Sequence, residues 1–179
     1  MRWSRLLALC ILLLVPLTSH AQTPTHRPPR STTVKNAVKS HEAAIRQGLD
    51  RWAQAFRSHD VHAIMALYAP GGVAYDLVPP LQYVGADAYR KDYEEFLAQY
   101  EGPIAIELRD VHIVASDGVA FATSLQRISG TLKNGQHSDV WVRVTNGFRK
   151  INGQWLDTHD HVSVPADLAR GKAVLDLKP

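Results

Sequence analysis

Asp76 is the first residue of the sequence that points to chemistry. It lies in the stretch GGVAYDLVPPLQYVG, residues 71–85, which is largely apolar and which Tyr83 helps to close. A carboxylate held among apolar groups has a raised pKa and is a common starting point for a general base. A strand-end acid that accepts backbone hydrogen bonds is the alternative, and the sequence leaves both open. Tyr83 is a candidate ligand-binding residue beside it.

The segment HDHVS, which begins at His159, contains a second set of chemically capable side chains. His159 and His161 are two residues apart, so on a strand they share a face and could chelate a metal with a further ligand such as Asp157. The sequence offers no helical His-x-x-x-His pair and no cysteine to support such a site. Hydrogen-bonded structural histidines are the preferred interpretation, and we expect neither a metal nor a cofactor.

Other chemistries lack their sequence signatures. The PGG segment before the first expected strand has neither the spacing of a phosphate-binding loop nor the helix that must follow one. A G-x-S-x-G nucleophile elbow is also absent from the sequence. Nucleotide binding and serine hydrolase chemistry are therefore disfavoured.

The N-terminal 21 residues look like a secretory signal. Arg2 and Arg5 precede the run LLALCILLLVPL, and SHA ending at Ala21 offers small residues at the cleavage positions. The single cysteine, Cys10, lies inside that run, so the mature protein would carry no disulfide. We expect a periplasmic or secreted protein with no integral membrane segment after signal cleavage.

The charge of the chain is unevenly distributed. The formal net charge is +3, but the signal and the Pro/Thr-rich stretch 22–40 hold six basic residues and no acid, which leaves the body at −3. Stretch 22–40 has the composition of a disordered basic spacer. Because the basic residues lie outside the body, the pI of about 9.1 does not indicate a nucleic-acid partner.

Periodicity predicts three helices before the strands begin. Apolar residues spaced by three, four and seven give a helix over about 34–56. Asp60 looks like the N-cap of a short second helix that Pro70 and Gly71 end. A third helix fits ADAYRKDYEEFLAQY, residues 86–100.

After the helices the apolar period becomes two, as in strands. Four alternating segments follow, at residues 104–115, 119–132, 138–151 and 154–164. A phase slip near Asp110 suggests a bulge, and Asn134-Gly135 and Asn152-Gly153 are hairpin turn signals. The predicted fold is α+β, with three N-terminal helices packed on a strongly curved, mainly antiparallel sheet that forms a cone with one pocket.

Three motifs carry a resemblance to a known family. RWAQAFRSHDVHAIMALYAPGGVAYD, YVGADAYRKDYEEF and FRKINGQWLDTHDHVSVP resemble the SnoaL-like group of the nuclear transport factor 2 superfamily. That superfamily includes ketosteroid isomerases, polyketide cyclases and the association domain of calmodulin-dependent kinases. The resemblance covers about residues 41–165, which we take as one domain, and leaves 166–179 as a C-terminal tail. The fold alone does not decide the function.

The resemblance assigns roles to three residues. The spacing from LYA places Asp76 on the general base of the ketosteroid isomerases, in which a tyrosine and a protonated aspartate form the oxyanion hole. The matching positions here are Trp52 and Thr145, whose indole N–H and hydroxyl can each donate one hydrogen bond. The resemblance therefore implies that Asp76, Trp52 and Thr145 are the catalytic residues.

Alternation then predicts the rest of the pocket wall. If Thr145 points inward, Arg143 and Trp141 point inward as well, and the valines between them face outward, where members of the superfamily pair as dimers. On the other strands the residues expected to point inward are Phe121, Leu125 and Arg127, and Leu156, Thr158, Asp160 and Val162. The candidate ligand-binding residues are Arg143, Arg127, Trp141, Asp160 and Tyr83.

Two functions remain open from the sequence. The first is an isomerase- or cyclase-type enzyme in which Asp76 removes a proton next to a carbonyl of an apolar substrate. The second is a non-catalytic ligand-binding or dimeric scaffold domain that holds a small carboxylate through Arg143. A salt bridge between Asp76 and Arg143 would favour the second. Both predict a homodimer through the outer sheet face.

Overall fold

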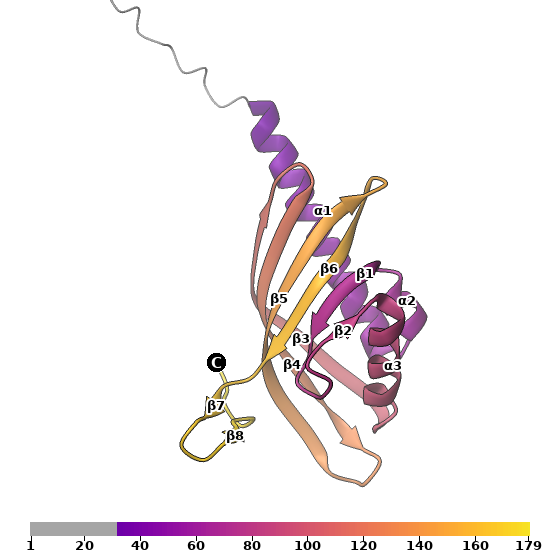
Figure 1. Ribbon diagram of the computed structural model, residues 1–179, viewed down its shortest axis with the longest axis vertical. Helices are drawn as coiled ribbons and strands as arrows, with labels where there is room; N and C mark the ends of the chain where they lie inside the picture. The colour runs from indigo at the N-terminus through magenta and orange to yellow at the C-terminus, as the bar shows by residue number, and fades with distance from the viewer. Residues whose placement is uncertain (1–31) are drawn as a thin grey trace, which may run out of the picture.

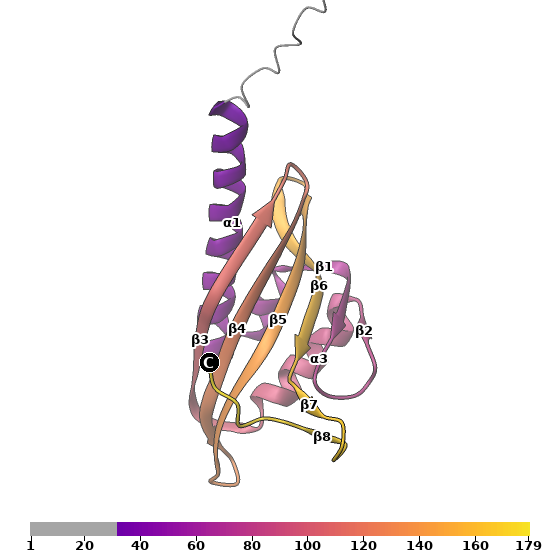
Figure 2. The ribbon, with the colours of Figure 1, turned by 90° about the vertical axis from the view of Figure 1, so that its left-hand side faces the viewer.

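The longest helix, α1 (Thr32–Arg57), runs beside β3 and projects beyond the sheet at its N-terminal end (Figures 1 and 2). The computed structural model describes residues 32–179, so the predicted signal and most of the predicted spacer lie outside the described residues. Residues 32–40, assigned to the spacer from sequence, belong to α1. Ile45, Leu49 and Phe56 form the buried stripe that periodicity predicted.

Two shorter helices follow α1, and the second of them packs against the sheet. Asp60 caps α2 (Val61–Met65), because its carboxylate accepts the backbone N–H of Ala63 at 2.9 Å. α3 (Ala86–Leu97) ends earlier than the sequence predicted. Pro70 and Gly71 do not end a helix as expected, since they lie within a strand.

Six strands form one sheet in the order β2-β1-β6-β5-β4-β3 (Figure 1). Their bounds are β1 (Tyr68–Tyr75), β2 (Tyr83–Val84), β3 (Tyr100–Ala115), β4 (Val119–Leu132), β5 (His137–Ile151) and β6 (Gln154–Ser163). β1 runs parallel to β6, and the other neighbours are antiparallel. The prediction of an α+β fold with a mainly antiparallel sheet is therefore confirmed.

The predicted turn and bulge residues adopt the expected backbone. Asn152 and Gly153 have φ angles of 50° and 84°, in the left-handed region that a tight hairpin turn requires. Asp110 has a φ of 52° at a register shift between Arg109 and His112, which confirms the bulge.

A second bulge, in β6, was not predicted. Gly147 of β5 pairs with His159 and Phe148 pairs with Asp157, so Thr158 is an extra residue on β6. The bulge places both Asp157 and Asp160 on the inner face. The sequence prediction that Leu156 and Thr158 point inward is wrong for this reason.

The predicted inner face of β5 is also wrong. Val142, Val144, Asn146 and Phe148 are buried and line the inner face. Because side chains alternate with a period of two, the residues between them face outward, and a one-residue error in phase reverses every assignment. Trp141, Arg143 and Thr145 therefore lie on the outer face.

The same correction applies to β4. Ser124, Gln126 and Ile128 lie on its inner side, so Phe121, Leu125 and Arg127 face outward. Arg127 makes a two-pronged ion pair with Asp139 of β5, at 2.8 and 2.9 Å. Arg127 is thus a partner of a strand neighbour on the outer face and does not reach the pocket.

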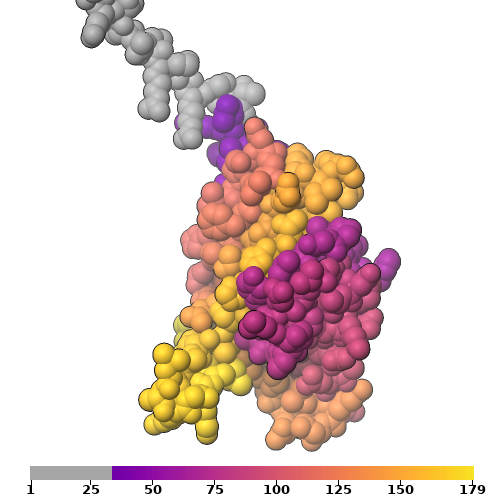
Figure 3. Space-filling model, in the orientation of Figure 1, coloured from indigo at the N-terminus to yellow at the C-terminus, as the bar shows by residue number. Residues whose placement is uncertain are grey.

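The segment after β6 forms a small hairpin of β7 (Ala166–Asp167) and β8 (Lys172–Ala173), seen as a yellow lobe in Figure 3. Near the end of the chain, the Lys178 ammonium lies 3.1 Å from the Asp139 carboxylate. Within residues 32–179, no helix combines the length and the apolar character needed to cross a membrane.

Candidate functional site

A cavity of about 360 Å³ lies between α1, α3 and the inner face of the sheet. α3 presents Tyr89, Asp92, Tyr93 and Phe96 to it, because residues three and four apart share one face of a helix. Its aromatic lining is Trp52, Phe56, Tyr68, Tyr83, Tyr89, Tyr93, Phe96, Phe148 and Trp155. The cavity has the size and apolar character of a small-molecule site.

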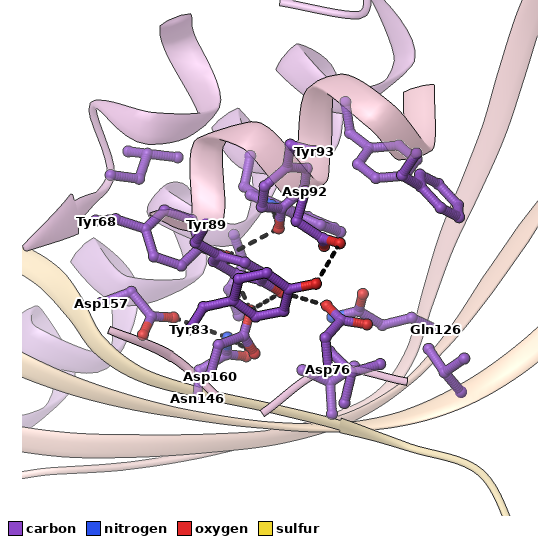
Figure 4. Close-up of a pocket in the computed structure, with 18 of the residues that line it drawn as sticks. Tyr68, Asp76, Tyr83, Tyr89, Asp92, Tyr93, Gln126, Asn146, Asp157 and Asp160 are labelled. Atoms are coloured by element: carbon purple, nitrogen blue, oxygen red, sulfur yellow. Dashed lines mark hydrogen bonds between the residues drawn. The ribbon is translucent and has the colours of Figure 1, made fainter. Parts of the chain in front are cut away.

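Asp160 is the most deeply buried acid in this cavity (Figure 4). It accepts the Tyr68 hydroxyl at 2.9 Å and the Asn146 side-chain amide at 3.1 Å. Burial raises the pKa of Asp160 to about 7, because the interior disfavours the charged form more than the hydrogen bond from Tyr68 favours it, and the charge of Asp76 adds to the shift. Asp160 can therefore act as a proton donor or acceptor near neutral pH.

Asp157 is a second buried carboxyl beside Asp160. The Asn146 amide donates to Asp157 at 2.8 Å as well as to Asp160, so one side chain links the two acids. Burial, and then the charge of Asp160, raises the pKa of Asp157. Ionising both carboxyl groups would bring two negative charges together inside the protein. The Asp157–Asp160 pair therefore keeps one proton.

A chain of hydroxyl groups leads from α1 to Asp160. The Trp52 indole donates to the Tyr93 hydroxyl at 3.0 Å, and the Tyr93 and Tyr68 hydroxyls are 2.9 Å apart. Because Tyr68 donates to Asp160, Tyr93 must donate to Tyr68. Trp52 therefore orients the tyrosine chain, and its only N–H is already used there.

Tyr89 lies between the two acids Asp76 and Asp160 (Figure 4). Its hydroxyl donates to Asp76 at 2.6 Å and is 3.4 Å from the nearer oxygen of Asp160. The hydroxyl has one proton, which the shorter contact directs to Asp76. Its oxygen can then accept a proton from a neutral Asp160, so Tyr89 connects the acids.

The edge of the cavity carries a further acid from α3. The Tyr83 hydroxyl donates to Asp92 at 2.8 Å and lies 3.0 Å from the carbonyl oxygen of Pro79. Burial raises the pKa of Asp92, and the nearby Asp76 adds to the shift. Tyr83 and Asp92 are thus joined by a hydrogen bond in the wall of the cavity.

Four of the residues predicted from sequence meet at this cavity: Asp76, Trp52, Tyr83 and Asp160. Four others, Thr145, Arg143, Trp141 and Arg127, are on the outer face. Sequence reasoning missed Tyr68, Tyr89, Asp92, Tyr93, Asn146 and Asp157. The helix that carries Tyr89 and Tyr93 was predicted, but the partners of their hydroxyl groups come from other segments of the chain.

His159 and His161 lie on the outer face, next to Tyr75. The Nδ1 of His159 is 3.0 Å from the carbonyl oxygen of Val73, and its ring packs edge-on against Tyr75. The β6 bulge turns Asp157 to the opposite face, so the three-ligand face considered from sequence does not form. Residues 32–179 contain no group of three or more His, Cys, Asp or Glu side chains arranged to hold a metal ion.

Residues 45–167 match the SnoaL-like domain family, and the chain belongs to this family. A solved NTF2-like protein of unknown function from Pseudomonas putida KT2440 is 35% identical, with a TM-score of 0.73, over 79% of this chain and 98% of that chain. The chain thus has the fold of the nuclear transport factor 2 superfamily. No curated protein matches it in sequence.

Two further solved structures show how widely the fold is used. One from Xanthomonas campestris, named for a calcium/calmodulin-dependent protein kinase II association domain, is 26% identical, with a TM-score of 0.61, over 72% of this chain and 88% of that chain. A ketosteroid isomerase-like protein from Erwinia carotovora atroseptica is 24% identical, with a TM-score of 0.59, over 68% of this chain and 93% of that chain. At that identity the second likeness concerns the fold alone.

Proposed function

We propose that the protein is an isomerase- or cyclase-type enzyme that transfers a proton next to a carbonyl group of an apolar substrate. The observation that carries this proposal is the position of Tyr89 between Asp76 and Asp160. Two carboxyl groups with different environments in one apolar pocket are the usual basis for dividing the roles of acid and base.

In this proposal Asp76 is the base and Asp160 is the acid. Asp76 accepts the proton from the carbon next to the carbonyl, and the electron pair moves to the carbonyl oxygen. Asp160, held protonated by its burial, donates a hydrogen bond or its proton to that oxygen. Asp76 then returns its proton to another carbon of the substrate, and the carbonyl oxygen gives back to Asp160 any proton that it took up, which completes a double-bond shift.

Solvent deuterium incorporation tests this proposal directly. A panel of apolar ketones is incubated in D₂O with the protein, and exchange next to the carbonyl is followed by proton NMR. The proposal expects exchange above the buffer rate for at least one member of the panel. A panel that shows no exchange above buffer counts against it and favours a non-catalytic ligand-binding domain.

The geometry does not favour that alternative. A salt bridge between Asp76 and Arg143 would have filled the pocket and suited a closed binding or scaffold domain. Arg143 is exposed on the outer face, and Asp76 instead accepts the Tyr89 hydroxyl. Both oxygens of Asp76 accept hydrogen bonds, one from the backbone N–H of Leu77 and one from the Tyr89 hydroxyl, and the carboxylate borders the cavity.

We also propose that the outer sheet face forms a homodimer. Val114, Val119 and Phe121 are 55%, 61% and 47% exposed, and Val114 and Phe121 are paired residues of β3 and β4. Burial of such a cluster against a second copy stabilises association.

We expect Phe121→Asp to shift the sedimentation coefficient from dimer to monomer, whereas Val84→Asp, on β2, leaves it unchanged. A monomeric wild type would exclude the dimer.

Export is proposed from the N-terminal sequence alone. Cleavage after Ala21 gives a mature chain that begins at Gln22. Mass spectrometry of the protein from the periplasmic fraction tests this, and a chain that retains residues 1–21 would contradict it.

A further inference from the structure

The pocket contains acids and no basic residue. Its lining includes the carboxyl groups of Asp76, Asp92, Glu95, Asp157 and Asp160, and it includes no Arg, Lys or His. None of the ion pairs found within residues 32–179 involves any of these five acids. A carboxylate ligand would meet like charges here with no cation to offset them.

The acids occupy two levels of the pocket. Asp157 and Asp160 are 5% and 4% exposed, at the bottom. Asp92 is half-buried and Glu95 is exposed, one turn apart on the same face of α3, so they lie at the opening. Asp92 and Glu95 are therefore the first negative charges that an incoming ligand meets.

Asn146 provides an independent sign of what the ligand must supply. Its side chain is 6% exposed and lines the pocket, and both of its amide hydrogens are used by Asp157 and Asp160. The Oδ1 of Asn146 has no hydrogen-bond partner within residues 32–179. The indole Nε1 of Trp155, on the same lining, is a buried donor that also has no partner within the described residues, so the lining leaves one acceptor and one donor for a ligand and supplies no cation.

The walls suit a cation as well as an apolar body. The rings of Tyr83 and Tyr89 are 5.4 Å apart at the side of the pocket that Asp92 borders. Aromatic faces attract ammonium groups, and the same faces also pack against hydrocarbon.

We infer that the pocket binds an apolar ligand that carries a protonated amine, with the ammonium at Asp92 and Glu95 and the apolar body against the aromatic walls. The charge-assisted hydrogen bond to Asp92 and the contact with Tyr83 favour this ligand over a neutral one. The inference concerns binding and holds whether or not Asp76 acts as a base.

Three probes with one naphthyl body and different head groups test it. They are 2-(1-naphthyl)ethylamine, 2-(1-naphthyl)ethanol and 1-naphthylacetic acid, and binding is measured by isothermal titration calorimetry at neutral pH. We expect the amine to bind about tenfold or more tighter than the alcohol, and the acid to bind weakest. The advantage of the amine should shrink as salt is added.

Two α3 variants locate the ammonium. Asp92→Asn should remove most of the preference for the amine over the alcohol, while Glu94→Gln, which is exposed and outside the pocket lining, should preserve it. An amine that binds no tighter than the alcohol, an unchanged preference in Asp92→Asn, or no binding by any probe would overturn the inference. Deuterium exchange on neutral ketones is a separate readout, so failure here leaves the catalytic proposal standing.

Discussion

Replacing Asp76 by asparagine should lower the rate of double-bond migration in β,γ-unsaturated ketones by about a hundredfold or more. The amide cannot take up the substrate proton, whereas its oxygen can still accept the Tyr89 hydroxyl that Asp76 accepts at 2.6 Å. The variant also gives up one acceptor, because the other oxygen of Asp76 accepts the backbone N–H of Leu77. The conjugated product absorbs in the ultraviolet, so the rate is read directly from absorbance.

Thr145→Val is the matched control for this experiment. The resemblance to ketosteroid isomerases assigned an oxyanion donor to Thr145, but the structure places it on the outer face of β5. We expect Thr145→Val to keep the wild-type rate. A rate loss in Thr145→Val, or an Asp76→Asn rate within about twofold of the wild type, would contradict the site described above.

The helices and long strands were predictable because their signals are local. The apolar stripe of α1 and the Asn152-Gly153 turn depend only on residues that are close in sequence, and the structure contains both. The resemblance also led to Asp76, which does line the cavity, while its role as a base stays a prediction.

The phase of β5 was not predicted, because alternation defines two faces without saying which one is covered. The valines of β5 were assigned outward to keep Thr145 inward. Burial of the apolar set, Val142 and Val144, would have been the safer choice, since it leaves Arg143 in solvent. The faces of β5 were assigned from the role expected of Thr145, although burial of the valines is the physically more favourable arrangement.

The tyrosine chain depends on contacts between distant segments. Tyr68 comes from β1, Tyr93 from α3 and Asp160 from β6, and their hydroxyl contacts span 25 and 92 residues of sequence. The β6 bulge at Thr158 decides that Asp157 joins Asp160 in the pocket. No local pattern specifies that extra residue, so this part of the site required the structure.

Asp160 makes the stability of the protein depend on pH in a defined direction. Its pKa is about 7 in the folded protein and about 3.9 in an unfolded chain, so the folded state binds the proton more tightly. The stability contributed by the neutral carboxyl is fully present below about pH 4. It is lost as the pH rises through about 7, where the buried group ionises.

Asp160→Asn should therefore become more stable relative to the wild type as the pH rises. Asparagine cannot ionise, so the difference in free energy of unfolding between variant and wild type should grow by about 2–4 kcal/mol from pH 4 to pH 8. Urea unfolding at pH 4, 6 and 8 measures this difference. Any constant packing effect of the amide cancels, because only the change with pH is compared.

Asp139→Asn is the control with the opposite shift. The hydrogen bond from Arg127 holds the pKa of Asp139 well below its usual range, so this carboxyl is ionised in folded and unfolded chains above about pH 5. Its effect on stability should be the same at pH 6 and pH 8. If Asp160→Asn were equally insensitive to pH, Asp160 would be ionised throughout, and the acid of the proposed reaction would have to be another group.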